Sequence, residues 1–123
     1  MKRDSEALKA RTKVFALRIL RLHRSLPTEE ARILGRQLLR SSTSIGANYR
    51  AACRGRSRAE FAAKLGIVLE EADETVFWLE LIQEGNIFPA EKLRELVREA
   101  NELVSIFVVS ARTVKTLPLQ SPL

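Results

Sequence analysis

The stretch LGRQLLRSSTSIGANYRAACRGRSRAEF, residues 34–61, decides the fold of this chain. At about 100° per residue its apolar side chains fall on one side of a helix. They are Leu34, Leu38, Ile45, Tyr49 and Ala52. Gly55 then suits a left-handed helix cap. Ser57 and Glu60 form a capping box directly before Phe61. The stretch therefore predicts a long helix, a short turn and the start of a second helix.

Helical spacing of apolar residues continues on both sides of this stretch. Pro27 disfavours helix in the residue before it, and Pro89 suits the first turn of a last helix. We therefore predict four helices, over about residues 5–24, 28–54, 57–84 and 89–117, and no strands. Such short connections make consecutive helices antiparallel. The expected fold is all-α, an antiparallel up-down-up-down four-helix bundle, in one domain over residues 1–123.

Charge is unevenly distributed along the 123 residues. Lys and Arg number 21 against 15 Asp and Glu, which gives a net charge of +6 and a pI of about 10.1. Residues 1–25 carry eight basic and two acidic side chains, and residues 26–56 carry six and two. Residues 57–85 carry two basic and seven acidic side chains. The basic first half favours a polyanion or an anionic surface as partner.

Five arginines of the second predicted helix lie within an arc of roughly 80°, opposite its apolar side. This arginine ridge consists of Arg32, Arg36, Arg40, Arg50 and Arg54. It carries nothing apolar in this interpretation, and its middle holds only the small Thr43 and Ala47. A ridge of this shape can lie against a phosphate backbone, or it can be a solvated face that keeps the protein soluble. Further phosphate contacts are expected from Lys9, Arg11, Arg18 and Arg21.

Two groups of polar residues complete the pattern. Gln37, Ser41, Ser44 and Asn48 share the side of the helix next to its core face, where we expect hydrogen bonds to a neighbouring helix. The third helix carries the acidic cluster Glu70, Glu71, Asp73 and Glu74. We expect these carboxylates to pair with arginines of the first two helices, within the chain or across a subunit contact. Gly46, inside a helix, predicts a close approach of another helix.

Catalytic residue types are sparse. His23 is the single histidine and Cys53 the single cysteine, and neither has a partner at ligand or nucleophile spacing. Di-metal sites in bundles need Glu-x-x-His pairs, which this chain lacks. We therefore expect no metal, no cofactor and no enzymatic activity. One cysteine, no apolar leader and no run of ~20 apolar residues predict a cytoplasmic protein that does not enter membranes.

The chain resembles a known bacterial family in three blocks. They are LGRQLLRSSTSIGANYRAA after a leucine-proline, then SRAEFAAKL, then EEADETVFWLELI. The first block is the most specific, around Arg40, Ser41, Ser44, Ile45 and Asn48; the last contributes Glu71, Glu74, Thr75, Trp78 and Leu79. The family is the four-helix bundle proteins first noticed inside intervening sequences of 23S ribosomal RNA genes. Many relatives carry a glutamate shortly after the asparagine, where this chain has Ala51 and Ala52.

The resemblance implies a four-helix bundle assembled as a homopentamer. A structurally similar group, the accessory variability proteins of diversity-generating retroelements, forms basic pentamers that bind nucleic acid. The leading hypothesis is a non-enzymatic oligomer that binds nucleic acid, structured RNA rather than DNA, through the arginine ridge. The alternative is a protein-interaction scaffold whose basic face docks an acidic protein. Nothing in the residues names the RNA, the partner or an action on the ribosome.

Overall fold

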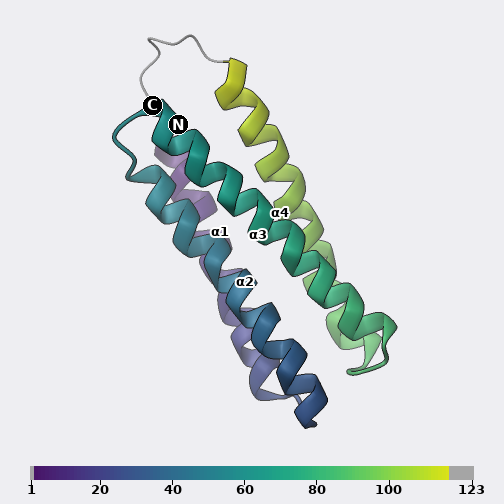
Figure 1. Cartoon of the computed structure of the whole chain (residues 1–123). Coiled ribbons are helices and arrows are strands. Elements are labelled where there is room, and N and C mark those ends of the chain that lie inside the picture. Colours follow the sequence, from purple (N-terminus) through teal and green to yellow (C-terminus); the bar gives the residue numbers. More distant parts are fainter. Residues whose placement is uncertain (1, 117–123) are drawn as a thin grey trace.

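The computed structural model describes residues 2–116, and the side chains of residues 4–115. It contains four helices: α1 (Lys2–Arg24), α2 (Glu29–Cys53), α3 (Arg58–Glu84) and α4 (Ala90–Thr116). Figure 1 shows them as one elongated bundle whose connections lie at alternate ends, so that consecutive helices run antiparallel. The fold is an all-α four-helix bundle, as the sequence predicts. Helix α1 begins three residues earlier than predicted, and residue 117, the predicted end of α4, lies outside the described residues.

Helix ends follow local chemistry. The Thr28 hydroxyl accepts a hydrogen bond from the Ala31 N–H and starts α2. Ser57 caps α3 by accepting from the Glu60 N–H, as predicted. The Glu60 carboxylate reaches back past Ser57 and accepts from the Arg56 N–H at 2.6 Å. Both orphan donors and the entry of the chain into α3 are thereby stabilised.

The predicted left-handed cap at Gly55 is wrong. All five glycines lie in the described part, and none has a positive φ. Instead the N–H groups of Arg54 and Gly55 donate to carbonyls three residues back, which tightens the last turn of α2. The left-handed position falls at Asn86, with φ 55°. There the N–H groups of Asn86 and Ile87 donate to Gln83 and Ile82, the paired bonds of a Schellman end to α3.

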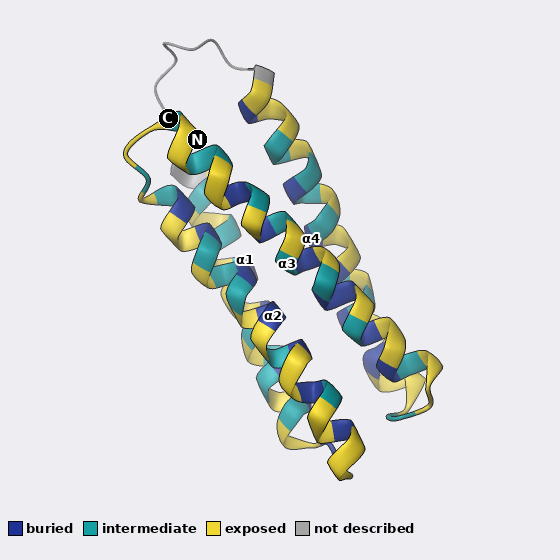
Figure 2. Cartoon of the chain, viewed as in Figure 1, coloured by how far each residue is buried: buried dark blue, intermediate teal, exposed yellow. Residues whose placement is uncertain are grey.

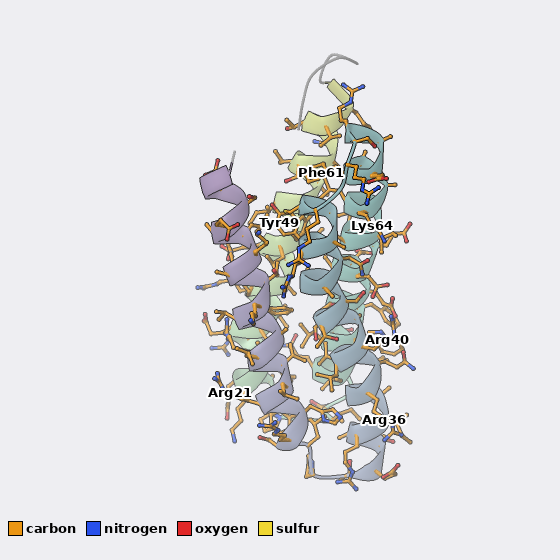
Figure 3. All side chains as sticks on the ribbon, turned by 90° about the vertical axis from the view of Figure 1, so that its left-hand side faces the viewer. Arg21, Arg36, Arg40, Tyr49, Phe61 and Lys64 are labelled. Carbon is orange, nitrogen blue, oxygen red and sulfur yellow. The ribbon has the colours of Figure 1, made fainter. Side chains whose placement is uncertain are left out.

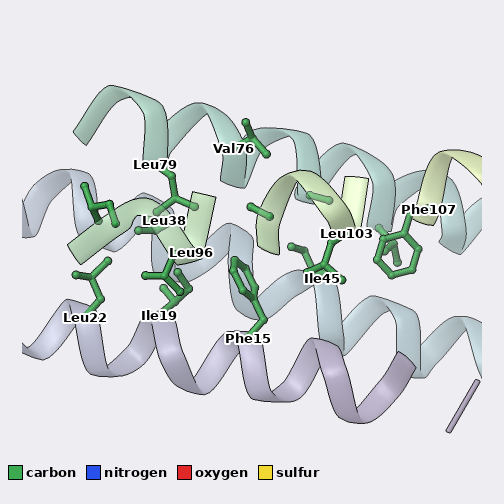
Figure 4. Close-up of a cluster of buried hydrophobic side chains, with 14 of the residues drawn as sticks. Phe15, Ile19, Leu22, Leu38, Ile45, Val76, Leu79, Leu96, Leu103 and Phe107 are labelled. Atoms are coloured by element: carbon green, nitrogen blue, oxygen red, sulfur yellow. The ribbon is translucent and has the colours of Figure 1, made fainter. Parts of the chain in front are cut away.

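The core runs the length of the bundle along the buried stripes of all four helices (Figure 2). Figure 4 shows side chains of four helices meeting there, among them Phe15, Ile45, Leu79 and Phe107. Helix α2 packs most extensively on α3, and α3 on α4, whereas α1 and α4 contact each other least. None of the described helices combines the length and the apolar character needed to cross a bilayer.

Glycines mark where α1 and α2 come close. A Cβ at Gly35 would lie 2.3 Å from Leu26 Cδ1 and 3.1 Å from His23 Cδ2. A Cβ at Gly46 would lie 3.4 Å from the Thr12 hydroxyl, an ordinary contact. Gly46 therefore does sit against a neighbouring helix, as predicted, but Gly35 is the tighter point. A Cβ at Gly66 in α3 would meet nothing within 4 Å.

We expect Gly66→Ala and Gly35→Ala to change stability in opposite directions. Alanine at position 66 reduces the entropy lost on folding and fills open space, which raises the free energy of unfolding by about 0.5–1 kcal/mol. Alanine at position 35 displaces Leu26 and presses on His23, which lowers it by about 1–3 kcal/mol. Urea unfolding at matched protein concentration measures both. Equal effects of the two substitutions would contradict the close approach at Gly35.

Candidate nucleic-acid interface

A basic groove of about 500 Å³ lies between α1 and α2. Lys9 and Lys13 line it from α1, and Arg50 and Arg54 from α2. The other lining side chains are small, namely Ala10, Ala16, Thr43, Gly46 and Ala47. Among the lining residues described, Glu6 is the one carboxylate. Gly46 packs against Thr12 of α1, and the small Thr43 and Ala47 line the groove at the middle of the ridge, which is shallow as predicted.

Three of the four groove cations keep their charge uncompensated. Lys9 pairs with Glu6, with 2.6 Å between Nζ and Oε1. Within residues 4–115, Lys13, Arg50 and Arg54 take part in no ion pair, and all three side chains are exposed. Their like charges repel one another, so an anion in the groove is favoured by electrostatics.

The arginines near the start of α2 are tied to their own helix. Arg32 donates weakly to the Leu26 carbonyl at 3.4 Å and lies 3.5 Å from a Glu29 carboxylate oxygen. Arg36 lies 3.9 Å from the same carboxylate and is 60% exposed. Ile33 lies about 20° beyond the edge of this arc and is 48% exposed, so an apolar side chain borders the ridge that was expected to carry nothing apolar. The positive charge of Arg32 and Arg36 is therefore partly compensated by Glu29.

Arg40 bridges α2 to the acidic cluster of α3. Its guanidinium donates to Glu71 Oε2 at 3.1 Å and also to Glu74 Oε1, which further accepts from the indole N–H of Trp78 at 3.1 Å. The hydrogen bonds from Arg40 and Trp78 hold the pKa of the Glu74 carboxyl below its ordinary value of 4.5. The acidic cluster therefore pairs with an arginine of the same chain, as expected, and this arginine is Arg40. Because its guanidinium is held by Glu71 and Glu74, Arg40 is not free to contact a phosphate, which corrects the sequence-based expectation.

The polar stripe of α2 divides into two roles. Buried Ser41 lies 2.8 Å from the Thr75 hydroxyl of α3 and donates to the Leu38 carbonyl, so it links neighbouring helices as predicted. Asn48 instead donates to the Ser44 hydroxyl at 2.8 Å and to the Ser44 carbonyl, within α2. Gln37 is exposed. Asn48 and Ser44 lie half-buried beside the core and do not enter the groove lining.

The α1 arginines named from the sequence lie away from the groove. Arg11 donates to Glu99 at 2.7 and 2.8 Å and to Glu102 at 3.0 Å, both on α4. Arg18 also faces Glu99, since its charge contributes to lowering the pKa of that carboxyl. In Figure 3 Arg21 extends from α1, and Arg36 and Arg40 from α2, on opposite sides of the view. The structure therefore does not bring Arg11, Arg18 and Arg21 together with the ridge.

Lys13 is the groove residue that sequence reasoning missed. Its signal was present, because Lys9 and Lys13 are four residues apart and share one side of α1. What the sequence did not show is which side of α1 faces α2. Thr12 shows this orientation: it is fully buried, donates to the Lys9 carbonyl and lies against Gly46.

The side chains that the sequence singled out for metal or catalytic chemistry lie apart from this groove. No group of three or more His, Cys, Asp or Glu side chains there could hold a metal ion. His23 Nε2 is buried without a hydrogen-bond partner, packed beside Gly35 at the α1–α2 contact. Burial, and then the neighbouring Cys53 thiol, raise the pKa of the Tyr49 hydroxyl, so that it stays protonated.

The fold and this surface define a four-helix-bundle protein with a basic face formed by its first two helices. A sequence model of the family "23S rRNA-intervening sequence protein" matches residues 6–108. The chain belongs to this family. It is also similar to the crystal structure of a protein with unknown function from the S23 ribosomal protein family of Bacteroides thetaiotaomicron. That likeness has 36% sequence identity and a TM-score of 0.78, and it covers 85% of this chain and 97% of the other. No curated protein matches the chain.

The Arg11–Glu99 pair gives a pH-dependent prediction. The hydrogen bonds from Arg11 lower the pKa of Glu99 below 4.5 in the folded state. A lowered pKa contributes stability above the unfolded-state value, and this contribution is lost as the pH falls through the folded-state pKa. We expect Arg11→Gln to lower the free energy of unfolding by about 1 kcal/mol at neutral pH. The difference in the free energy of unfolding between Arg11→Gln and wild type shrinks below pH 4.5. Urea unfolding at neutral pH and below pH 4.5 measures this difference.

Arg94→Gln is the matched control, since Arg94 is an exposed arginine of α4. It removes one positive charge from the same chain with little effect on stability. A difference between Arg11→Gln and wild type that is the same at both pH values would show that Arg11 stabilises through packing of its side chain and not through its charge.

Proposed function

We propose that this protein is a non-enzymatic, nucleic-acid-binding protein that contacts phosphates through the basic face of α1 and α2. The observation that carries the proposal is the groove, in which Lys13, Arg50 and Arg54 are exposed and unpaired within the described residues. Cations placed on one face at this density neutralise phosphates and release their counterions. The single cysteine, Cys53, supports a cytoplasmic site of action, where thiols stay reduced.

We propose RNA rather than DNA as the nucleic acid, by association with the 23S rRNA intervening sequences for which the family is named. Recognition is expected to be weakly sequence-specific. No aromatic side chain is among the groove lining residues described, so the groove offers unpaired bases no surface for stacking. Contacts to phosphate position a protein on its nucleic acid without reading its sequence.

We expect the triple variant Arg36→Gln, Arg50→Gln, Arg54→Gln to bind structured RNA more weakly and with a flatter salt dependence. Each lost phosphate contact reduces the slope of log K against log salt by about 0.7–0.9. The fold is preserved, because the three side chains are exposed and lie outside the core. Fluorescence anisotropy across a salt series measures the slope, and circular dichroism checks the fold.

The charge-matched control is Arg94→Gln, Arg98→Gln, Arg112→Gln, three exposed arginines of α4. It removes the same charge from another face, and we expect the wild-type slope to be nearly kept. Equal losses in the two variants would show that net charge alone attracts the RNA. A wild-type protein that binds an acidic protein partner but no RNA would favour a protein-interaction scaffold.

We further propose that the protein assembles as a homo-oligomer, a pentamer by resemblance to its family. The supporting observation is that α3 exposes three large apolar side chains on its outer side, Ile67, Phe77 and Leu81, at 40%, 55% and 40% exposure. They lie within an arc of roughly 80° that also carries Glu70 and Glu74 between Ile67 and Phe77. Trp78 packs edge-on against Phe77, with ring centroids 5.1 Å apart. Phe77 and Leu81, one turn apart, are the apolar pair that we expect to contact another subunit.

Phe77→Glu is expected to dissociate this assembly, because it places a charge beside Leu81, where we expect the subunit contact. Static light scattering should then give a mass near the 13.9 kDa of one chain, against a multiple of it for wild type. The control is Val109→Glu on α4, where an isolated valine is 60% exposed. Dissociation by Val109→Glu and not by Phe77→Glu would place the subunit contact on α4.

A further inference from the structure

The two walls of the basic groove are built in the same way. Lys9 and Lys13 on α1 are four residues apart, and so are Arg50 and Arg54 on α2. Four residues of helix rise about 6 Å, so each wall presents two cations one turn apart on the same side of its helix. Since α1 and α2 are antiparallel neighbours, these two rows border one trough from both sides.

The rest of the groove lining is small. Ala47 and Gly46 on α2 and Ala10 on α1 contribute no side chain longer than a methyl group. A phosphate in the groove is within reach of cations from both helices, whereas one on the outer ridge meets cations of α2 only. The outer ridge is also less available, because Arg40 is held by Glu71 and Glu74 and Arg32 by its own helix.

We propose that the groove seats one sugar–phosphate strand of a base-paired RNA, with Lys13, Arg50 and Arg54 contacting its phosphates. This inference rests on the proposed function and narrows it to a site. The strand is base-paired because the lining described offers no aromatic platform for unpaired bases, so that binding depends on the backbone alone. In a paired stem the bases turn inward and the phosphates keep a regular spacing.

The deciding variant is Ala47→Gln, which puts a longer side chain into the groove lining without changing any charge. Ala47 is exposed, and glutamine is a good helix former, so the fold is kept. We expect the affinity for a hairpin RNA with a stem of about 16 base pairs to fall about tenfold. Ala51→Gln is the matched control, at an exposed alanine one turn further along α2 that does not line the groove. It should bind as wild type does.

Single charge variants locate the phosphates. Lys13→Gln removes a groove cation on α1, and we expect the salt slope for the same hairpin to fall by about one unit. Arg36→Gln removes an arginine of the outer ridge that is 60% exposed, and we expect it to lower the slope less than Lys13→Gln does. Anisotropy titrations on one hairpin, over one salt series, compare all four variants.

Each contrary outcome overturns a distinct claim. Wild-type affinity in Ala47→Gln, together with weakened binding in the triple arginine variant, would reject the groove and leave the proposed function standing. Absence of RNA binding by the wild-type protein would reject both. An unpaired RNA of the same length that binds as tightly as the hairpin would reject the base-paired strand. A changed mass of Ala47→Gln in light scattering would place the groove in a subunit contact and reject it as an RNA site.

Discussion

The close approach of α2 to α1 is the constraint from which the basic surface follows. A Cβ at Gly35 would press on the Leu26 side chain of the connection and on His23 of α1, and at Gly46 helix α2 lies against the buried Thr12 of α1. Helices that pack this closely leave only small side chains along their shared edge. The long cations on either side then rise above that edge. The same packing that stabilises the bundle thus produces a trough with basic walls, and no separate loop or domain is needed to build it.

The acidic third helix limits how far the basic surface extends. Arg40 is drawn toward Glu71 and Glu74, and the indole of Trp78 adds a further hydrogen bond to the same carboxylate. Ion pairs of this exposure contribute little to stability but fix the orientation of the groups that form them. One end of the arginine ridge is therefore neutralised within the chain. The uncompensated charge collects at the other end, around Arg50 and Arg54.

Helices α1 and α4 contact each other least, and Arg11 links them through its fork with Glu99 and Glu102. The positive charge of Arg11 is therefore compensated by carboxylates of α4. Two basic residues of one helix, Arg11 and Lys13, thus serve opposite purposes. Arg11 forms ion pairs with α4, and Lys13 lines the groove between α1 and α2 without an ion pair among the described residues. Two residues along a helix turn the side chain by about 200°, which is sufficient to change neighbours.

The sequence by itself determined the four helices, their order and the apolar seam, because helical periodicity and capping residues act over a few positions. Ser57 and Glu60 cap α3 where predicted, and Ser41 reaches a neighbouring helix as expected. Only the tertiary structure decided which cations are free. Arg40 is paired and Lys13 is exposed because of what lies on the adjacent helix, and a helical wheel of one segment carries no information about its neighbours.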